Sequence, residues 1–226
     1  MTAGGTREPI DSVRFVGNRS SGRMGFALAG EAARRGAEVA LIAANVALDP
    51  PLGARVIPVQ TAAELAAACR TELPHCDVLL MSAAVADFRP IGAVDRKLKK
   101  DEGVPKLELE PTEDVLSSLA ALRREDQTLV GFAAEHGEDA VQLGRGKLER
   151  KRLDALVVND ISAAGVGFEA EDNEVTILTA DGGERHVPRS RKERVARAVL
   201  DEVERLRTAR DGTDGARADT RSPARV

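Results

Sequence analysis

The sequence has very few aromatic residues: five Phe, no Trp and no Tyr among 226 residues. Proteins that bind single-stranded nucleic acid stack bases on aromatic side chains, so this composition argues against that class. A reductase that relies on a Tyr–Lys pair is excluded because no Tyr is present. The core must therefore be built from Val, Leu, Ile and Ala.

Cysteine is also scarce. Cys69 and Cys76 are the two cysteines, and the only histidine near them is His75. This spacing suits neither a zinc site nor a disulfide framework. We expect two small core or surface residues of a cytoplasmic protein.

Long apolar runs and a strong charge of one sign are missing as well. No run approaches the roughly 20 apolar residues that cross a bilayer, and the N-terminus has no signal-peptide pattern. The formal net charge of −4 gives no reason to expect a nucleic-acid or membrane partner. We expect a cytoplasmic globular protein.

Short apolar runs alternate with helical patterns along the first 160 residues. Runs of this length suit strands buried on both faces of a parallel sheet. Thr61 and Glu64 form a capping box at the start of one helical pattern. The alternation predicts a doubly wound, Rossmann-like α/β domain with three layers and a mostly parallel sheet. The expected strands are residues 37–43, 76–82, 128–132 and 155–158, and the expected helices are residues 21–35, 61–73, 112–124 and 138–152.

The C-terminal part has a different pattern. Residues 174–179 and 185–187 flank Asp181-Gly182-Gly183, which predicts an antiparallel hairpin. An amphipathic helix over residues 191–206 follows. From Thr208 onward the sequence is polar and glycine-containing, so we expect a domain over residues 1–207 and a disordered tail over residues 208–226.

The first six residues resemble the end of a strand that enters a glycine-rich turn. Nothing in the sequence precedes them, so we expect the first strand to be missing or reduced to a stub.

The glycine-rich turn Gly4-Gly5-Thr6 and residues 18–25 are the first candidate for chemistry. Free backbone N–H groups at a helix N-terminus bind phosphate, because the orphan donors and the helix dipole both favour an anion. The alternative is a plain N-cap, Ser20 or Ser21, with glycines required for packing. No P-loop and no GxGxxG motif is present.

Two charged segments come next. Asp87 follows a buried strand, where ligands bind in open α/β sheets, and can hold a metal ion that bridges phosphates. Its alternative role is to cap the loop. Lys97, Lys99 and Lys100 can neutralise a triphosphate or simply form a solvated face.

Phe132 and a pair of lysines complete the candidates. Phe132 follows a strand and either packs against a base or belongs to the core. Lys147 and Lys151 are four residues apart, so they share one helix face, as phosphate contacts or as ordinary surface residues.

Taken in order, seven segments of the chain match one family. The segments TAGGTREPID…VRFVGNRSSGRMGFALA, AAVADFRP, KLKK, PTEDVL, GFAAE, KLERKRLD and VVND…GFEAEDNEV resemble bacterial phosphopantothenoylcysteine synthetase, commonly the C-terminal half of a bifunctional coenzyme A protein. The likeness runs from Thr2 to about Leu206.

The resemblance implies a ligase of coenzyme A biosynthesis that uses CTP and Mg²⁺. The carboxylate of 4′-phosphopantothenate would attack the α-phosphorus to give an acyl-cytidylate and pyrophosphate, and the amine of L-cysteine would then displace CMP. It also implies a homodimer with residues 90–110 at the contact. The flavin-binding decarboxylase half is missing from this sequence, so no FMN is implied.

The resemblance also assigns residues. Lys97 matches the lysine required for acyl-nucleotide formation, Asn18 the asparagine that holds the intermediate, and Arg14 a substrate contact. The remaining positions are triphosphate contacts at Ser20, Lys147 and Lys151, a cation ligand at Asp87, and nucleoside contacts at Ala83, Ala84, Asp114 and Phe132.

The chain departs from the family at Arg23, where many relatives have Lys, and at residues 110–115. Two other interpretations stay open: a truncated or inactive nucleotide-binding module, and an NAD(P)-dependent oxidoreductase. The ligase hypothesis requires that Asn18, Asp87 and Lys97 surround one polyphosphate at one rim of the sheet.

Overall fold

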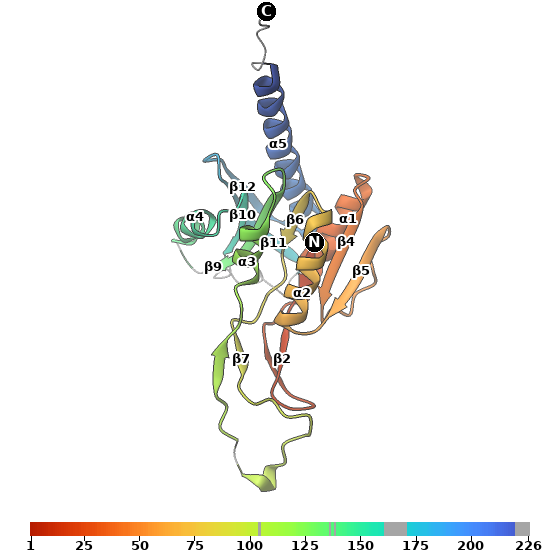
Figure 1. Ribbon diagram of the computed structural model, residues 1–226, viewed down its shortest axis with the longest axis vertical. Helices are drawn as coiled ribbons and strands as arrows, with labels where there is room; N and C mark the ends of the chain where they lie inside the picture. The colour runs from red at the N-terminus through yellow and green to blue at the C-terminus, as the bar shows by residue number, and fades with distance from the viewer. Residues whose placement is uncertain (104, 136, 138, 161–170, 220–226) are drawn as a thin grey trace, which may run out of the picture.

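The computed structural model describes residues 1–219 except 104, 136, 138 and 161–170. One eight-stranded sheet forms the centre of the molecule (Figure 1). Its strands run parallel from β5 to β10, and β11 and β12 are antiparallel. In sheet order the strands are β12 (Glu184–Arg191), β11 (Asp172–Thr179), β10 (Ala155–Asp160), β9 (Thr128–Glu135), β6 (Val78–Met81), β1 (Thr2–Gly4), β4 (Val39–Ala44) and β5 (Ala54–Val59).

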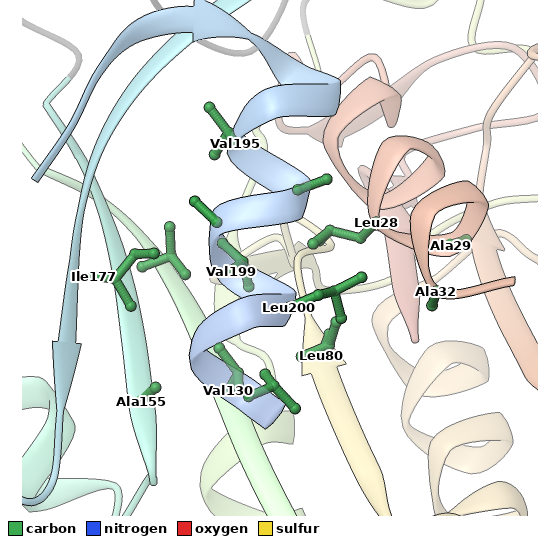
Figure 2. Packing of buried hydrophobic residues seen from close by; sticks show 14 of the residues in the cluster. Leu28, Ala29, Ala32, Leu80, Val130, Ala155, Ile177, Val195, Val199 and Leu200 are labelled. Carbon is green, nitrogen blue, oxygen red and sulfur yellow. The ribbon is translucent and has the colours of Figure 1, made fainter. Parts of the chain in front are cut away.

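Helices cover both faces of this sheet, which confirms the doubly wound, three-layer fold expected from the sequence. One face packs against α1 (Arg23–Arg34) and α5 (Lys192–Asp219), whose Leu28 and Val199 lie in one apolar cluster with sheet residues (Figure 2). The opposite face packs against α2 (Ala62–Glu72), α3 (Val115–Leu122) and α4 (Ala140–Arg150).

The local sequence signals explain where most elements begin. Thr61 is the N-cap of α2, and its hydroxyl accepts a hydrogen bond from the Glu64 N–H. The Glu64 carboxylate in turn accepts from the Gln60 N–H, one residue earlier than a capping box places it. The expected hairpin is the pair β11–β12, which turns at Asp181 and Gly182.

The sequence led to one expectation about each end of the domain, and the C-terminal one differs from the structure. Helix α5 continues to Asp219, so residues 208–219 are helical and do not form the disordered tail expected from Thr208. Arg210 anchors this extension by donating to Asp154 and to the Gln127 carbonyl. Residues 220–226 lie outside the described residues. The expected stub of a first strand is β1, three residues long, which lies between β4 and β6.

Edge strand β5 was not expected from the sequence because the exposed Arg55 and Pro58 interrupt the apolar run that is typical of a buried strand. Two hairpins were also not expected: β2 (Arg7–Pro9) with β3 (Phe15–Gly17), and β7 (Phe88–Pro90) with β8 (Leu109–Pro111). Both project from the sheet at the end opposite the C-terminus of α5, and residues 91–103 and 105–108 extend furthest (Figure 1). We call β7, β8 and the residues between them the arm.

The two cysteines are ordinary parts of this fold. Cys69 lies on the buried face of α2, and burial raises the pKa of its thiol to about 11. Among the described residues, no helix is both long and apolar enough to span a bilayer.

Candidate active site

A cavity of about 390 Å³ lies at the carboxyl ends of the central strands. Ligands bind at this edge in doubly wound sheets because the strand order reverses there. Three segments surround the cavity: the loop that leads into α1, the loop after β6, and the start of α3. Side chains from β9, α4, β10, β11 and α5 complete its wall.

Hydrogen bonds tie the loops after β1 and β6 together. The Thr6 hydroxyl accepts from the Ala86 N–H at 2.9 Å, and the Ala84 N–H donates to the Gly4 carbonyl at 2.8 Å. The Asn18 side-chain amide donates to the Val85 carbonyl at 3.0 Å. Asn18 is thereby held beside the loop that carries Asp87.

Glycine is required where the loop before α1 packs on the first strand. A Cβ on Gly5 would lie 2.8 Å from the Asn18 carbonyl oxygen, and one on Gly25 would lie 2.5 Å from the Ala3 Cβ. These contacts bring the start of α1 directly over the end of β1. Any side chain at either position would push the loop out of the cavity.

The N-terminus of α1 has no side-chain cap. Its N-cap is Gly22, with φ of 77°, and not Ser20 or Ser21, which both line the cavity. Arg23, Met24 and Gly25 at the start of α1 line the cavity, and within the described part of the chain no N-cap side chain bonds the first backbone N–H groups of this helix. This arrangement favours an anion over the plain N-cap that the sequence left open.

Asp114 has two roles at the opposite side of the cavity. It is the N-cap of α3, accepting from the Ser117 N–H at 3.1 Å, and its carboxylate also pairs with the Lys151 ammonium at 2.8 Å. Burial raises the pKa of Asp114, but the hydrogen bonds from Lys151 and Ser117 outweigh burial and leave it below its usual value. Lys147 likewise pairs with Glu135. Lys147 of α4 and Lys151 at its C-cap are therefore each paired with a carboxylate, and their role as triphosphate contacts stays a prediction.

Phe132 is partly buried on β9 and contributes both to the cavity wall and to the cluster beneath α1 and α5. The two alternatives for this residue, base contact and core residue, are therefore compatible.

Asp87 is the carboxylate best placed to hold a cation. It is exposed at the rim and, within the described part of the chain, forms no ion pair with Lys or Arg. The described residues contain no group of three or more His, Cys, Asp or Glu that could enclose a metal. One carboxylate beside an anion-binding loop fits a Mg²⁺ ion that arrives with phosphates, since Mg²⁺ commonly takes one or two carboxylates and keeps water or phosphate oxygens as its other ligands.

The cavity brings together most of the residues proposed from the sequence. It is lined by Asn18, Ser20, Ala83, Ala84, Asp87, Asp114, Phe132, Lys147 and Lys151.

Lys97 and Arg14 do not line this cavity. The Arg14 guanidinium donates to the Leu98 carbonyl at 2.8 Å, and the Asp11 carboxylate accepts from the Leu98 N–H at 3.2 Å. These bonds fix the middle of the arm, at Leu98, against the turn of the β2–β3 hairpin. The sequence predicted that Asn18, Asp87 and Lys97 lie around one polyphosphate site. Asn18 and Asp87 do line one cavity, whereas Lys97 of the same chain does not. The reason is that β7 carries the chain away from the rim after Asp87.

Several polar residues of the cavity wall were not assigned from the sequence, among them Asn159, Asn173 and Lys192. The sequence contained a signal for these residues, because each of them is a polar residue at the end of a row of apolar residues on the buried face of its helix or strand. Asn159 continues the row of Ala155 and Val157 on β10.

The chain has clear relatives. Residues 1–206 match the family model described as the DNA/pantothenate metabolism flavoprotein C-terminal domain. The coenzyme A biosynthesis bifunctional protein CoaBC of Bacillus subtilis (strain 168) is 46% identical over 207 residues, which are 91% of this chain and 50% of that protein. The chain spans about half the length of the curated relatives it matches.

Solved structures agree with the fold. The crystal structure of the C-terminal domain of a coenzyme A biosynthesis bifunctional protein CoaBC has a TM-score of 0.76 at 36% identity, covering 91% of this chain and 92% of that chain. A Cab2 variant in complex with phosphopantothenate-cysteine has a TM-score of 0.72 at 16% identity, covering 93% of this chain and 87% of that one, and shows likeness of fold alone.

Proposed function

Because this chain belongs to the family of the DNA/pantothenate metabolism flavoprotein C-terminal domain, we propose that it is a ligase that joins 4′-phosphopantothenate to L-cysteine. CTP is the nucleotide we expect to activate the carboxylate. The observation that carries the proposal is one cavity that combines an uncapped helix N-terminus, the Asn18 amide and the Asp87 carboxylate.

The chemistry requires positioning and not a covalent nucleophile. A carboxylate does not form an amide at neutral pH without a leaving group, so a nucleotidyl transfer must come first. The protein must align the carboxylate with the α-phosphorus and stabilise the charge that develops there. The N-terminus of α1 supplies backbone donors for phosphate, and the held amide of Asn18 is placed to orient the acyl group.

The nucleoside end of the nucleotide fits the α3–α4 side of the cavity. There the Asp114–Lys151 and Glu135–Lys147 pairs balance their charges, whereas the α1 side has uncapped N–H groups. We therefore place the phosphates toward α1 and the base toward Phe132, with Ala83 and Ala84 of the loop after β6 beside the ribose. Mg²⁺ bound at Asp87 would neutralise charge on the phosphates.

We further propose that the enzyme is a homodimer and that Lys97 acts in the cavity of its partner. The arm and the neighbouring β2–β3 hairpin carry most of the exposed large apolar side chains: Val13, Phe15, Phe88, Ile91, Leu107 and Leu109. A concentration of exposed apolar residues marks an interaction surface. Such a contact would also explain why Lys97 lies outside its own cavity, because it would bring Lys97 to the cavity of the partner.

A pyrophosphate-release assay with 4′-phosphopantothenate and Mg²⁺ tests the proposed function. We expect release with CTP before any cysteine is added, and 4′-phosphopantothenoylcysteine after cysteine is added. Parallel reactions with ATP establish the base preference. Absence of release with both nucleotides would contradict the proposal and favour a nucleotide-binding module without activity.

A further inference from the structure

Three elements each end a buried apolar row with one polar residue at the same edge of the cavity. On β11, Asn173 is followed on the same buried face by Val175 and Ile177. On β10, Val157 is followed by Asn159. An apolar residue at each end position would extend the core, so the polar residues need another explanation.

Lys192 is the corresponding residue of α5. The buried stripe of this helix is Lys192, Val195, Ala196, Val199, Leu200 and Val203, at intervals of three and four residues. Lys192 is only 4% exposed, which is rare for a lysine, and it lines the cavity.

The sheet register brings the three residues close together. Asn159 of β10 pairs with Val175, which lies two residues along β11 from Asn173. Asn173 pairs with Ser190 of β12, and Lys192 follows two residues later at the start of α5. All three side chains line the one cavity.

The two asparagines carry unsatisfied acceptors. The side-chain carbonyl oxygens of Asn159 and Asn173 are buried, and neither accepts a hydrogen bond from any residue that the structure describes. Asn173 as a whole is 6% exposed. A buried acceptor without a donor destabilises the fold, so two such oxygens in one cavity point to a ligand that brings N–H or O–H groups.

We propose that Asn159, Asn173 and Lys192 form the binding site for the α-ammonium and α-carboxylate groups of the amino-acid substrate. The proposal deepens the proposed function and rests on it. The two carbonyl oxygens accept from the ammonium group, and Lys192 pairs with the carboxylate. A phosphate group at the same place would pair with Lys192 but would leave both carbonyl oxygens without a donor unless the two amides rotated, and the second experiment below distinguishes the two ligands.

The electrostatics of Lys192 agree with an anionic partner. Burial lowers the pKa of its ammonium group and the neighbouring Arg23 lowers it further, while Glu193 raises it without outweighing them. A carboxylate beside Lys192 offsets both effects by stabilising the charged form.

The first experiment compares cysteine with cysteamine, which has the same thiol and amine but no carboxylate. The wild-type chain is expected to use cysteine with the higher kcat/KM. Lys192→Met should reduce that preference by about tenfold or more, because the cation that recognises the carboxylate is gone. Arg194→Met, an exposed change on the same helix, should keep the wild-type preference. An unchanged preference in Lys192→Met overturns the proposal.

The second experiment separates this site from the nucleotide site. Asn173→Leu should raise the KM for cysteine by about tenfold, while pyrophosphate release before cysteine addition stays close to wild type. Its Tm should be unchanged or higher, since the unsatisfied acceptor is removed. A lower Tm with unchanged KM for cysteine indicates a structural asparagine, and loss of pyrophosphate release indicates a phosphate contact. Either result overturns the proposal.

A third measurement does not depend on turnover. Added L-cysteine should raise the Tm of the wild-type chain and not that of Lys192→Met. If wild type releases no pyrophosphate, the proposed function fails, and this binding comparison still decides whether the amino-acid site exists.

Discussion

At the scale of single residues, Asn18 and Lys97 are expected to act in different half-reactions. Asn18 lines the cavity and is held by the Val85 carbonyl, so it can orient the acyl-nucleotide for attack by the amine. Asn18→Asp should therefore let pyrophosphate form but slow product formation, so that the intermediate accumulates. Lys97→Gln should abolish pyrophosphate release. Separate assays of pyrophosphate and of the final amide distinguish the two variants, and normal pyrophosphate release by Lys97→Gln contradicts its role.

A second residue-scale prediction concerns Glu31 of α1, whose carboxylate also lies 3.8 Å from the Arg197 guanidinium of α5. It is 7% exposed and accepts from Arg34 at 2.6 and 2.7 Å and from Arg35 at 2.9 Å. Hydrogen bonds from Arg34, followed by those from Arg35, lower its pKa from 4.5 to about 2 despite burial. Because the folded-state pKa is depressed, this stabilisation is present above about pH 4.5 and disappears as the pH falls toward 2.

Glu31→Gln should consequently lower the free energy of unfolding by about 1.5–3 kcal/mol at pH 7, the range for hydrogen bonds to charged groups. The difference from wild type should shrink as the pH is lowered from 4.5 toward 2. Urea unfolding at several pH values measures it, with the exposed Glu149→Gln as control. If the difference in free energy of unfolding between Glu31→Gln and wild type does not depend on pH, the stabilisation does not come from the charged carboxylate of Glu31.

At the scale of elements, the C-terminal end of α5 is expected to stabilise the fold through arginines beyond Leu206. Arg210 donates to the Asp154 carboxylate at 2.7 Å and to the Gln127 carbonyl at 3.0 Å. A chain that ends at Leu206 should lose about 2 kcal/mol and roughly 4–8 °C in Tm. A chain that ends at Asp211 keeps these contacts and should melt like the full chain. Equal melting of the two truncated chains would contradict the prediction.

At the scale of the whole molecule, the arm determines whether one chain makes a complete active site. If Lys97 acts in the partner's cavity, a mixture of inactive Lys97→Gln and inactive Asn18→Asp chains should regain activity after exchange of subunits. Each mixed dimer then holds one cavity with both native residues. Light scattering gives the oligomeric state, and the product assay gives the recovered activity. A dimer without recovery indicates that Lys97 acts in its own chain.

The sequence alone allowed the layered fold to be predicted, since short apolar runs and 3.6-residue periods depend on neighbouring positions. The capping box at Thr61, the hairpin around Asp181 and the loops carrying Asn18 and Asp87 are local signals of this kind. Strand β5 was not expected because an exposed edge strand with a proline lacks such a pattern. The continuation of α5 past Thr208 depends on contacts with Asp154 and Gln127, which are distant in the sequence.

The residues proposed to bind phosphate and nucleoside could be chosen from the sequence, because loops after buried strands meet at one edge of any parallel sheet. Only the tertiary structure showed that Lys97 lies on an arm outside its own cavity and that Asn159, Asn173 and Lys192 meet inside it. The physical reason is that strand register and the course of the arm arise from pairings between distant segments. Motif spacing along the chain does not encode these pairings.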